Sequence, residues 1–211
     1  MSKTQFFRFL AAGCGIWGVS IQLHQGGSGM LLYYTVLSNI LTFSFMLYLV
    51  YYEAKQGPVN RNPALLRFKG GVTMAIAITF MIYHFLLAPR VSPEDYWNIR
   101  NFLVHYIAPF CLIFDTLFFD RKNSYKWQDP FYWTVIPLLY FAFAIFNGLV
   151  LQLPVPGSKD SPFPYFFINI RQYGWETVAR NTLFIAMAYI FCCYILVLLK
   201  KGIGKTVTNK G

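Results

Sequence analysis

Long stretches without charged side chains limit most strongly what this chain can fold into. From Phe9 to Tyr52 the sequence contains no Asp, Glu, Lys or Arg. A membrane core is about 30 Å thick, and a helix needs about 20 apolar residues to cross it. The chain is 56% hydrophobic and only 12% charged, whereas a soluble domain carries about 25% charged residues. We therefore expect an all-α polytopic membrane protein.

The apolar stretches predict six transmembrane helices in one bundle, which forms a single domain over residues 1–211. A glycine-rich turn at residues 26–29 separates the first two helices, and loops rich in proline and charge separate the others. Lys3 and Arg8 followed by "FLAAGC" resemble a secretory signal. The apolar run continues for about two further helical turns, so we expect an uncleaved first helix, with Arg8 reaching the interface at its end. The predicted spans are about 6–23, 31–52, 70–88, 101–119, 131–153 and 181–199.

The distribution of lysine and arginine predicts how the bundle lies in the membrane. Cytoplasmic loops carry an excess of these residues. With six spans, thirteen of the 18 basic residues fall on the side that holds both termini, so we expect cytoplasmic termini. The thirteen are Lys3, Arg8, Lys55, Arg61, Arg67, Lys69, Arg121, Lys122, Lys126, Lys200, Lys201, Lys205 and Lys210. The other five are Arg90, Arg100, Lys159, Arg171 and Arg180. The basic residues as a whole are scattered over loops. This distribution is not typical of a nucleic-acid-binding surface.

Polar side chains lie at a common depth in five of the predicted spans. Thr35, Ser38 and Asn39 share one face of the second helix. At 1.5 Å per residue, several side chains lie roughly 6–8 Å below the outer ends of their helices. Such side chains normally face a bundle interior or a cavity, so we expect a polar pocket toward the outer leaflet. The residues at this level are Thr35, His84, His105 and Asn147, with Asn181 at the start of the last span.

Each of these residues also has a structural explanation. Serine and threonine in membrane helices usually bond a backbone carbonyl or a neighbouring helix. Asn39 can join two helices, and Asn147 beside Gly148 can permit close packing. His84 can be an interfacial ring. Asp115 is about 15 Å from His105 along the helix, so we expect it to pair with a polar group on another helix or a basic loop residue.

The combination of side chains favours a hydrolase over these explanations. A hydroxyl, an imidazole and amide donors match a nucleophile, a base and an oxyanion stabiliser. Thr35 is the candidate nucleophile and His105 the candidate base. A carbonyl or an amide is expected to orient His105, since no acid is placed to do so. Pro109 should bend the helix and free the carbonyl of His105. The candidate substrate contacts are Ser38, Asn39, His84, Asn147 and Asn181.

Several segments of the chain resemble the androgen-induced-gene family of polytopic membrane proteins, which has many bacterial relatives. The segments are "YYTVLSNIL", "LVHYIAPFCLIFDTLFF", "WTVIPLLYFAF…NG" and "SPFPYFF" followed by "YGWETVARN". Animal members are threonine hydrolases of fatty acid esters of hydroxy fatty acids. The resemblance implies this activity, with Thr35 and His105 in the positions of the essential threonine and histidine, and a place in the bacterial inner membrane. A Pro-rich insertion before Tyr165 departs from the family pattern.

Two other functions fit the same residues. His84 and His105 lie at similar depth on consecutive helices and could ligate one haem iron from opposite sides. A polar site between helices could also serve a small-solute transporter. The hydrolase hypothesis needs no cofactor or metal, and the four cysteines have no zinc-site spacing. Its expected partners are a lipid ester substrate and membrane lipids. No oligomeric state follows from the sequence.

Overall fold

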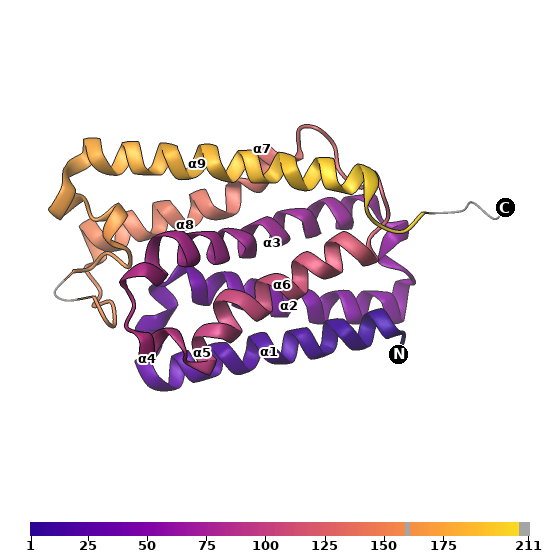
Figure 1. Cartoon of the computed structure of the whole chain (residues 1–211), viewed down its shortest axis with the longest axis horizontal. Helices are drawn as coiled ribbons and strands as arrows, with labels where there is room; N and C mark the ends of the chain where they lie inside the picture. Colours follow the sequence, from indigo (N-terminus) through magenta and orange to yellow (C-terminus); the bar gives the residue numbers. More distant parts are fainter. Residues whose placement is uncertain (159–160, 207–211) are drawn as a thin grey trace.

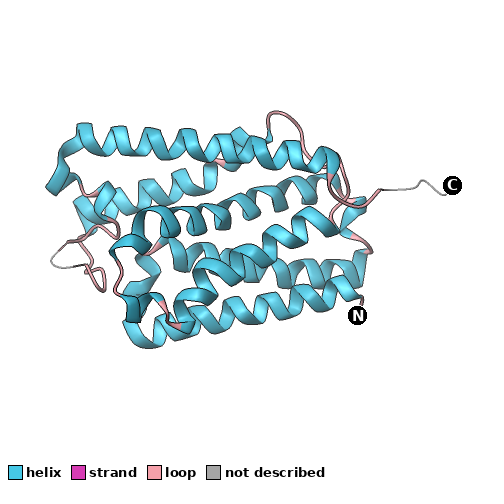
Figure 2. Ribbon diagram, viewed as in Figure 1, coloured by secondary structure: helices cyan, strands magenta, loops and turns pink. Residues whose placement is uncertain are grey.

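The predicted helical bundle is confirmed by the computed structural model, which describes residues 1–158 and 161–206. These residues form helices and connecting loops, with no β-strand among them (Figure 2). Six helices are long and apolar enough to cross a membrane: Lys3–Gly26, Tyr34–Gln56, Pro63–Arg90, Ile99–Phe119, Asp129–Leu151 and Ile170–Gly202. Lys159 and Lys210, which enter the charge count, lie outside the described residues.

The first helices begin and end at recognisable capping residues. Helix α1 (Lys3–Gly26) starts with a capping box between Ser2 and Gln5. After the 3-10 turn η1 (Ser28–Leu32), α2 (Tyr34–Gln56) ends at Gly57, whose φ of 87° suits glycine. A further 3-10 turn, η2 (Val59–Arg61), leads into α3 (Pro63–Ile82), which begins earlier than predicted.

Later spans combine short α-helical pieces with π-helical segments. Four π-helices interrupt or end the spans, and such segments are frequent at functional sites. They are η3 (Tyr83–Leu87), η5 (Leu103–Ile107), η6 (Asp115–Phe119) and η7 (Asn147–Leu151). The other elements are η4 (Ala88–Arg90), α4 (Pro93–Tyr96), α5 (Ile99–Phe102), α6 (Ala108–Phe114), α7 (Asp129–Trp133), α8 (Val135–Phe146), η8 (Phe166–Ile168) and α9 (Ile170–Gly202).

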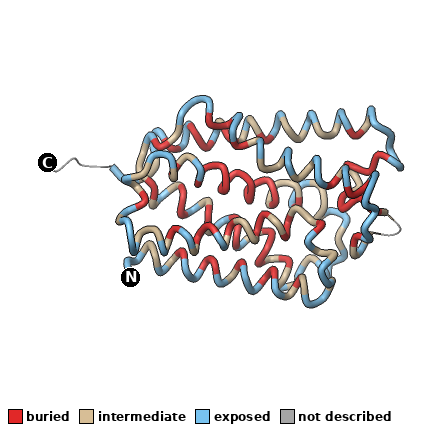
Figure 3. The backbone as a smooth tube through the Cα atoms, turned by 180° about the vertical axis from the view of Figure 1, so that it is seen from behind, coloured by how far each residue is buried: buried red, intermediate tan, exposed pale blue. Residues whose placement is uncertain are grey.

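Helix α3 lies in the middle of the bundle (Figure 1). It contacts α2 and α6 on one side and α7 on the other. Its residues from Gly70 to Thr79 are all buried, whereas α9 shows mainly exposed and half-buried positions (Figure 3). The beginning of α1 and the end of α9 lie at the same end of the bundle, as an even number of spans requires (Figure 1).

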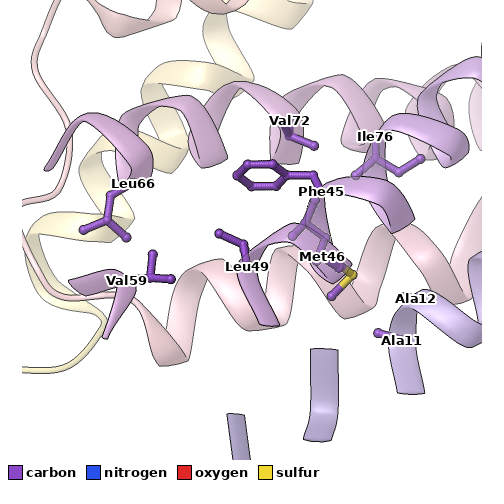
Figure 4. Close-up of a cluster of buried hydrophobic side chains, with 10 residues drawn as sticks. Ala11, Ala12, Phe45, Met46, Leu49, Val59, Leu66, Val72 and Ile76 are labelled. Atoms are coloured by element: carbon purple, nitrogen blue, oxygen red, sulfur yellow. The ribbon is translucent and has the colours of Figure 1, made fainter. Parts of the chain in front are cut away.

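Two buried clusters join α3 to its neighbours. One contains Met46 and Leu49 of α2 with Val72 and Ile76 of α3, and α1 closes it with Ala11 and Ala12 (Figure 4). The other joins α3 to α9 around the ring of Trp133. Helix α9 begins at Ile170, well before the predicted Asn181, with the side chain of Asn169 as its cap. A kink at Gly174, whose φ is 73°, divides its first turn from the rest of the helix.

Six charged side chains form an ion network at the end of the bundle that holds both chain termini; five of them are joined by ion pairs, and Lys200 joins them through backbone carbonyls. The Nε atom of Arg8 is 3.0 Å from both carboxylate oxygens of Asp115, and the Lys69 ammonium is 2.6 Å from Asp115 and 2.7 Å from Asp120. Glu53 pairs with Arg8, and Lys200 donates to the Asp120 carbonyl. The network has three positive and three negative charges. It consists of Arg8, Glu53, Lys69, Asp115, Asp120 and Lys200.

The network corrects two predictions and confirms a third. Arg8 does not extend to the interface, since it is 1% exposed and paired inside the bundle. Lys69 does not lie in a loop, because α3 begins at Pro63 and buries it completely. Asp115 does pair with groups on other helices, as expected. A buried charge needs such partners because its desolvation is costly.

Candidate active site

Thr35 and His105 meet inside the bundle, on different helices. Thr35 is the second residue of α2, and His105 lies within the π-helix η5. The Oγ1 atom of Thr35 is 3.3 Å from Nε2 of His105. The two residues are 7% and 8% exposed, so the contact is shielded from bulk water. A hydroxyl and a ring nitrogen at this distance can form the hydrogen bond that precedes proton transfer.

Asn101 fixes which nitrogen of His105 carries the proton. Nδ1 of His105 is 2.7 Å from Oδ1 of Asn101 and 3.2 Å from its backbone oxygen. Both oxygens can only accept, so Nδ1 is the donor of the neutral ring. The Asn101 amide nitrogen donates to the carbonyl of Tyr96 at 2.9 Å, which sets the direction of the amide. Nε2 therefore presents its lone pair to the Thr35 hydroxyl.

An amide in the role of orienting group was expected, but its identity was not recognised in the sequence. Asn101 stood there only as the first residue of a span. Its position four residues before His105 is a usable signal, because residues at this spacing are neighbours on a helix. The three side chains form a Thr–His–Asn arrangement, and arrangements of this kind serve as nucleophile, base and orienting group in enzymes of unrelated folds.

Tyr83 covers one face of the His105 ring. The two ring centroids are 3.7 Å apart and the planes differ by 17°. Tyr83 is buried at the start of η3. Its hydroxyl has no hydrogen-bond partner among the described residues. The stacking fixes the plane of the imidazole, while the hydrogen bond from Nδ1 to Asn101 fixes the direction of the ring within that plane.

The helix around His105 differs from the prediction in its hydrogen-bond register. In η5 the N–H of Ala108 bonds to the carbonyl of Leu103, five residues earlier. In this register Pro109 also leaves the carbonyl of Val104 without an N–H partner. The amide of Asn39 donates to this carbonyl at 3.0 Å.

Asn39 connects the backbone of Thr35 to that of the π-helix that carries His105. Its amide nitrogen also donates to the carbonyl of Thr35, at 2.7 Å. Both amide hydrogens therefore bond backbone carbonyls, one beside His105 and one of Thr35 itself. Asn39 is completely buried. This arrangement joins α2 to η5 at the level of the site.

A cavity of about 240 Å³ lies beside Thr35. Its walls come from α2, α3, α8, α9 and the loop before α9, and most of the side chains are apolar or aromatic, among them Ile82, Phe141 and Ile185. Thr35 lines the cavity, but His105 does not. Thr35 therefore borders the cavity, while the imidazole that contacts its hydroxyl lies outside the lining.

Tyr165 brings a second hydroxyl to the mouth of the site. Its oxygen accepts from the backbone N–H of Thr35 at 3.4 Å. The loop residue is 8% exposed, and burial raises its pKa above the ordinary value. The phenol therefore stays protonated and can donate a hydrogen bond. Sequence reasoning quoted Tyr165 in the Pro-rich loop but gave it no role.

Ser38 lies close to Thr35 and bonds other protein groups. Its hydroxyl lies 2.8 Å from that of Thr79 and donates to the carbonyl of Thr35 at 3.2 Å. Thr79 lines the cavity, whereas Ser38 and Asn39 do not. Both residues thus surround the backbone of the nucleophile.

The other predicted substrate contacts lie outside the cavity lining. The amide nitrogen of Asn147 donates to the carbonyl of Pro162 at 2.8 Å, and that of Asn181 to the carbonyl of Phe167 at 3.1 Å. Both bonds hold the loop that carries Tyr165. His84 is exposed, and its Nδ1 atom lies 3.2 Å from the hydroxyl of Tyr106.

No family model matches the chain, and searches of curated proteins and of solved structures also find no match.

Proposed function

We propose that this protein is a membrane-embedded threonine hydrolase that cleaves acyl esters of lipids. The observation that carries the proposal is the buried contact of 3.3 Å between Thr35 Oγ1 and His105 Nε2, with Nδ1 of the same ring held by Asn101. A base with its free nitrogen on a hydroxyl is the arrangement that activates a nucleophile. The resemblance to the androgen-induced-gene family supplies the ester, a fatty acid ester of a hydroxy fatty acid.

The reaction begins with attack of Thr35 on the ester carbonyl. Oγ1 bonds the carbonyl carbon while Nε2 of His105 takes the hydroxyl proton. The backbone N–H of Thr35 and the hydroxyl of Tyr165 are the donors for the oxyanion, since they already lie beside each other at the start of α2. The C–O bond to the alcohol then breaks, and His105 returns the proton to the leaving oxygen.

Water completes the reaction on the acyl-threonine intermediate. His105 takes a proton from water, the hydroxide attacks the acyl carbon, and the carboxylic acid leaves as Thr35 regains its proton. A helix end contributes a partial positive charge near the oxyanion, because Thr35 lies in the first turn of α2. The second half of the reaction thus uses the same groups as the first.

The charge distribution supports an orientation with cytoplasmic termini, and the resemblance to a family with many bacterial relatives implies the bacterial inner membrane. Thr35 would then face the outer leaflet, because α2 begins at the end of the bundle opposite to both chain termini. A lipid ester would approach the cavity sideways from this leaflet. The haem alternative is less compatible with the geometry, because both ring nitrogens of His105 contact protein groups.

Covalent labelling tests the proposal directly. Detergent-purified protein would react with a fluorophosphonate, and intact mass and peptide mapping would locate the adduct. We expect labelling at Thr35, no labelling in Thr35→Val, and labelling slower by about a hundredfold or more in His105→Ala, the typical contribution of a general base. Thr35→Val keeps the side-chain shape and removes only the nucleophile.

Two matched variants serve as controls. Thr134→Val removes another hydroxyl that lines the cavity, and His84→Ala removes the exposed histidine. Both should be labelled as rapidly as wild type. Labelling that persists in Thr35→Val, or a folded wild type that does not react, would contradict the hydrolase. Absorption spectra and flux measurements in vesicles would then test the haem and transport alternatives.

A further inference from the structure

The cavity beside Thr35 extends along the helices. Along α9 its lining runs from Thr182 to Ile190, and along α3 and its extension from Ile78 to Leu87. At 1.5 Å per residue both stretches span about 12–14 Å. We call this cavity the slot and take about 12–14 Å as its length along the helices.

Tyr189 and Trp133 lie at the inner end of this slot, where Tyr189 is one of the lining residues. The hydroxyl of Tyr189 donates to the carbonyl of Trp133 at 3.0 Å and so joins α9 to α7. Both residues are buried, Tyr189 with 2% exposure. Thr134, directly after Trp133, is the innermost lining residue on its span. We call the pair of Tyr189 and Trp133 the floor of the slot.

The position of His105 decides which part of an ester enters the slot. The base must reach the leaving alcohol oxygen, so the alcohol part lies on the His105 side of Thr35. His105 does not line the cavity, whereas Thr35 does. The acyl part is bound on the other side of the carbonyl carbon and therefore points into the slot. Its apolar lining suits a hydrocarbon chain.

We propose that the slot binds the acyl chain of the substrate and that its floor limits this chain to about ten carbons. An extended chain advances about 1.2 Å per bond, as the reach of an extended peptide shows. A slot of 12–14 Å therefore accepts about ten bonds at most. This inference rests on the proposed function, since it takes Thr35 as the point from which the chain is measured.

The architecture gives a reason for a slot at this place. Helix α9 contacts α7 near its inner end and η8 near its outer end. Between these contacts it covers the cavity with the half-buried Ile185 and Ala186. On α8, Leu138 lines the same cavity and is 51% exposed. A lipid chain can thus enter from the side, while the floor stops it at depth.

A series of esters with one alcohol and acyl chains of 4 to 16 carbons tests the proposal. We would measure kcat/KM for each ester with purified protein in detergent. We expect kcat/KM for the 16-carbon ester to be lower than for the 8- to 10-carbon esters by about tenfold or more, because overfilling a packed site is costly. Tyr189→Ala, which removes the floor, should move the optimum to longer chains.

A larger side chain inside the slot should move the optimal acyl-chain length to shorter chains. Ala186 lines the slot one turn above Tyr189, so Ala186→Phe should favour the 4-carbon ester. Ala188→Phe places the same bulk on an exposed position of α9. This control should keep the wild-type profile.

The outcomes separate this inference from the function on which it rests. Cleavage of all esters at equal rates, or a profile that Tyr189→Ala and Ala186→Phe leave unchanged, would overturn the acyl slot and leave the hydrolase intact. Failure of the folded wild type to cleave any ester would overturn the hydrolase. If Tyr189→Ala does not fold, Ala186→Phe alone still decides.

Discussion

At the scale of single residues, the site depends on the tautomer of one histidine. A neutral imidazole can act as a base only through its unprotonated nitrogen. Asn101 offers two oxygens to Nδ1, so the proton stays there and Nε2 faces Thr35. Without the Asn101 side chain, only the more distant backbone oxygen, at 3.2 Å, would favour a proton on Nδ1, although Tyr83 would still hold the plane of the ring.

Asn101→Ala should therefore lower kcat by about a hundredfold and change KM little. The loss of an orienting group reduces the population of the reactive tautomer, as a wrong tautomer is known to cost large factors in catalytic triads. Asn101→Asp should retain much of the activity, since its carboxylate can accept from Nδ1. Steady-state kinetics would give kcat and KM, and nitrogen NMR of labelled histidine would report the tautomer.

Asn98→Ala is the matched control for this experiment. The Asn98 side chain caps the same helix by accepting from the N–H of Arg100, but it has no bond to His105. Its loss should leave kcat and the tautomer unchanged. Equal effects of Asn98→Ala and Asn101→Ala on kcat and on the tautomer would show that Asn101 has a structural role only.

At the scale of elements, the contact between α2 and η5 brings the two reacting groups together. The π-helical register leaves the Val104 carbonyl for the Asn39 amide, and the same amide bonds the Thr35 carbonyl. The Asn39 amide thus bonds the carbonyl that the π-helical register leaves without an N–H partner, as buried polar groups require. Asn39 acts as a positioning residue for Thr35 and His105.

Asn39→Leu should reduce the stability by about 1–3 kcal/mol, because a carbonyl beside the site loses its buried partner. The rate of fluorophosphonate labelling should fall as well, since the two helices lose their common register. Thr42→Val is the control on the same face of α2, because the buried hydroxyl of Thr42 has no partner among the described residues. Thermal unfolding in detergent would measure the stability of both variants. An Asn39→Leu variant with the stability and the labelling rate of the wild type would contradict the positioning role.

At the scale of the whole molecule, the ion network and the candidate active site lie at opposite ends of the bundle. The network joins α1, α2, α3, η6 and α9 through six charged side chains. Such a network adds little stability over an apolar core, but removal of one member leaves buried charges without partners. Its members lie near the chain termini, far along the helices from Thr35.

Asp115→Ala should lower stability by about 3–5 kcal/mol, because Arg8 and Lys69 both lose a partner. For a chain of this length the melting temperature should fall by on the order of 10 °C. The labelling rate of the remaining folded protein should match wild type. Glu176→Gln, which removes an exposed acid, should melt like wild type. Equal melting temperatures for the two variants would contradict a structural role for the network.

The sequence by itself determined the class of fold and the pair of candidate catalytic residues. Six apolar stretches leave a bilayer as the suitable surrounding, and helices satisfy their own backbone hydrogen bonds there. Depth along each span is a simple function of residue number, so the level shared by Thr35 and His105 could be predicted. Their contact of 3.3 Å agrees with that prediction.

Only the tertiary structure decided what surrounds these residues. Rotation of each helix and the π-helical register follow from packing, which residue spacing does not encode. They turn Asn39 toward two carbonyls, place Asn101 on His105 and bury Arg8 beside Asp115. Tyr165 reaches Thr35 from 130 positions away, and such a contact exists only once the loop before α9 has folded onto the bundle.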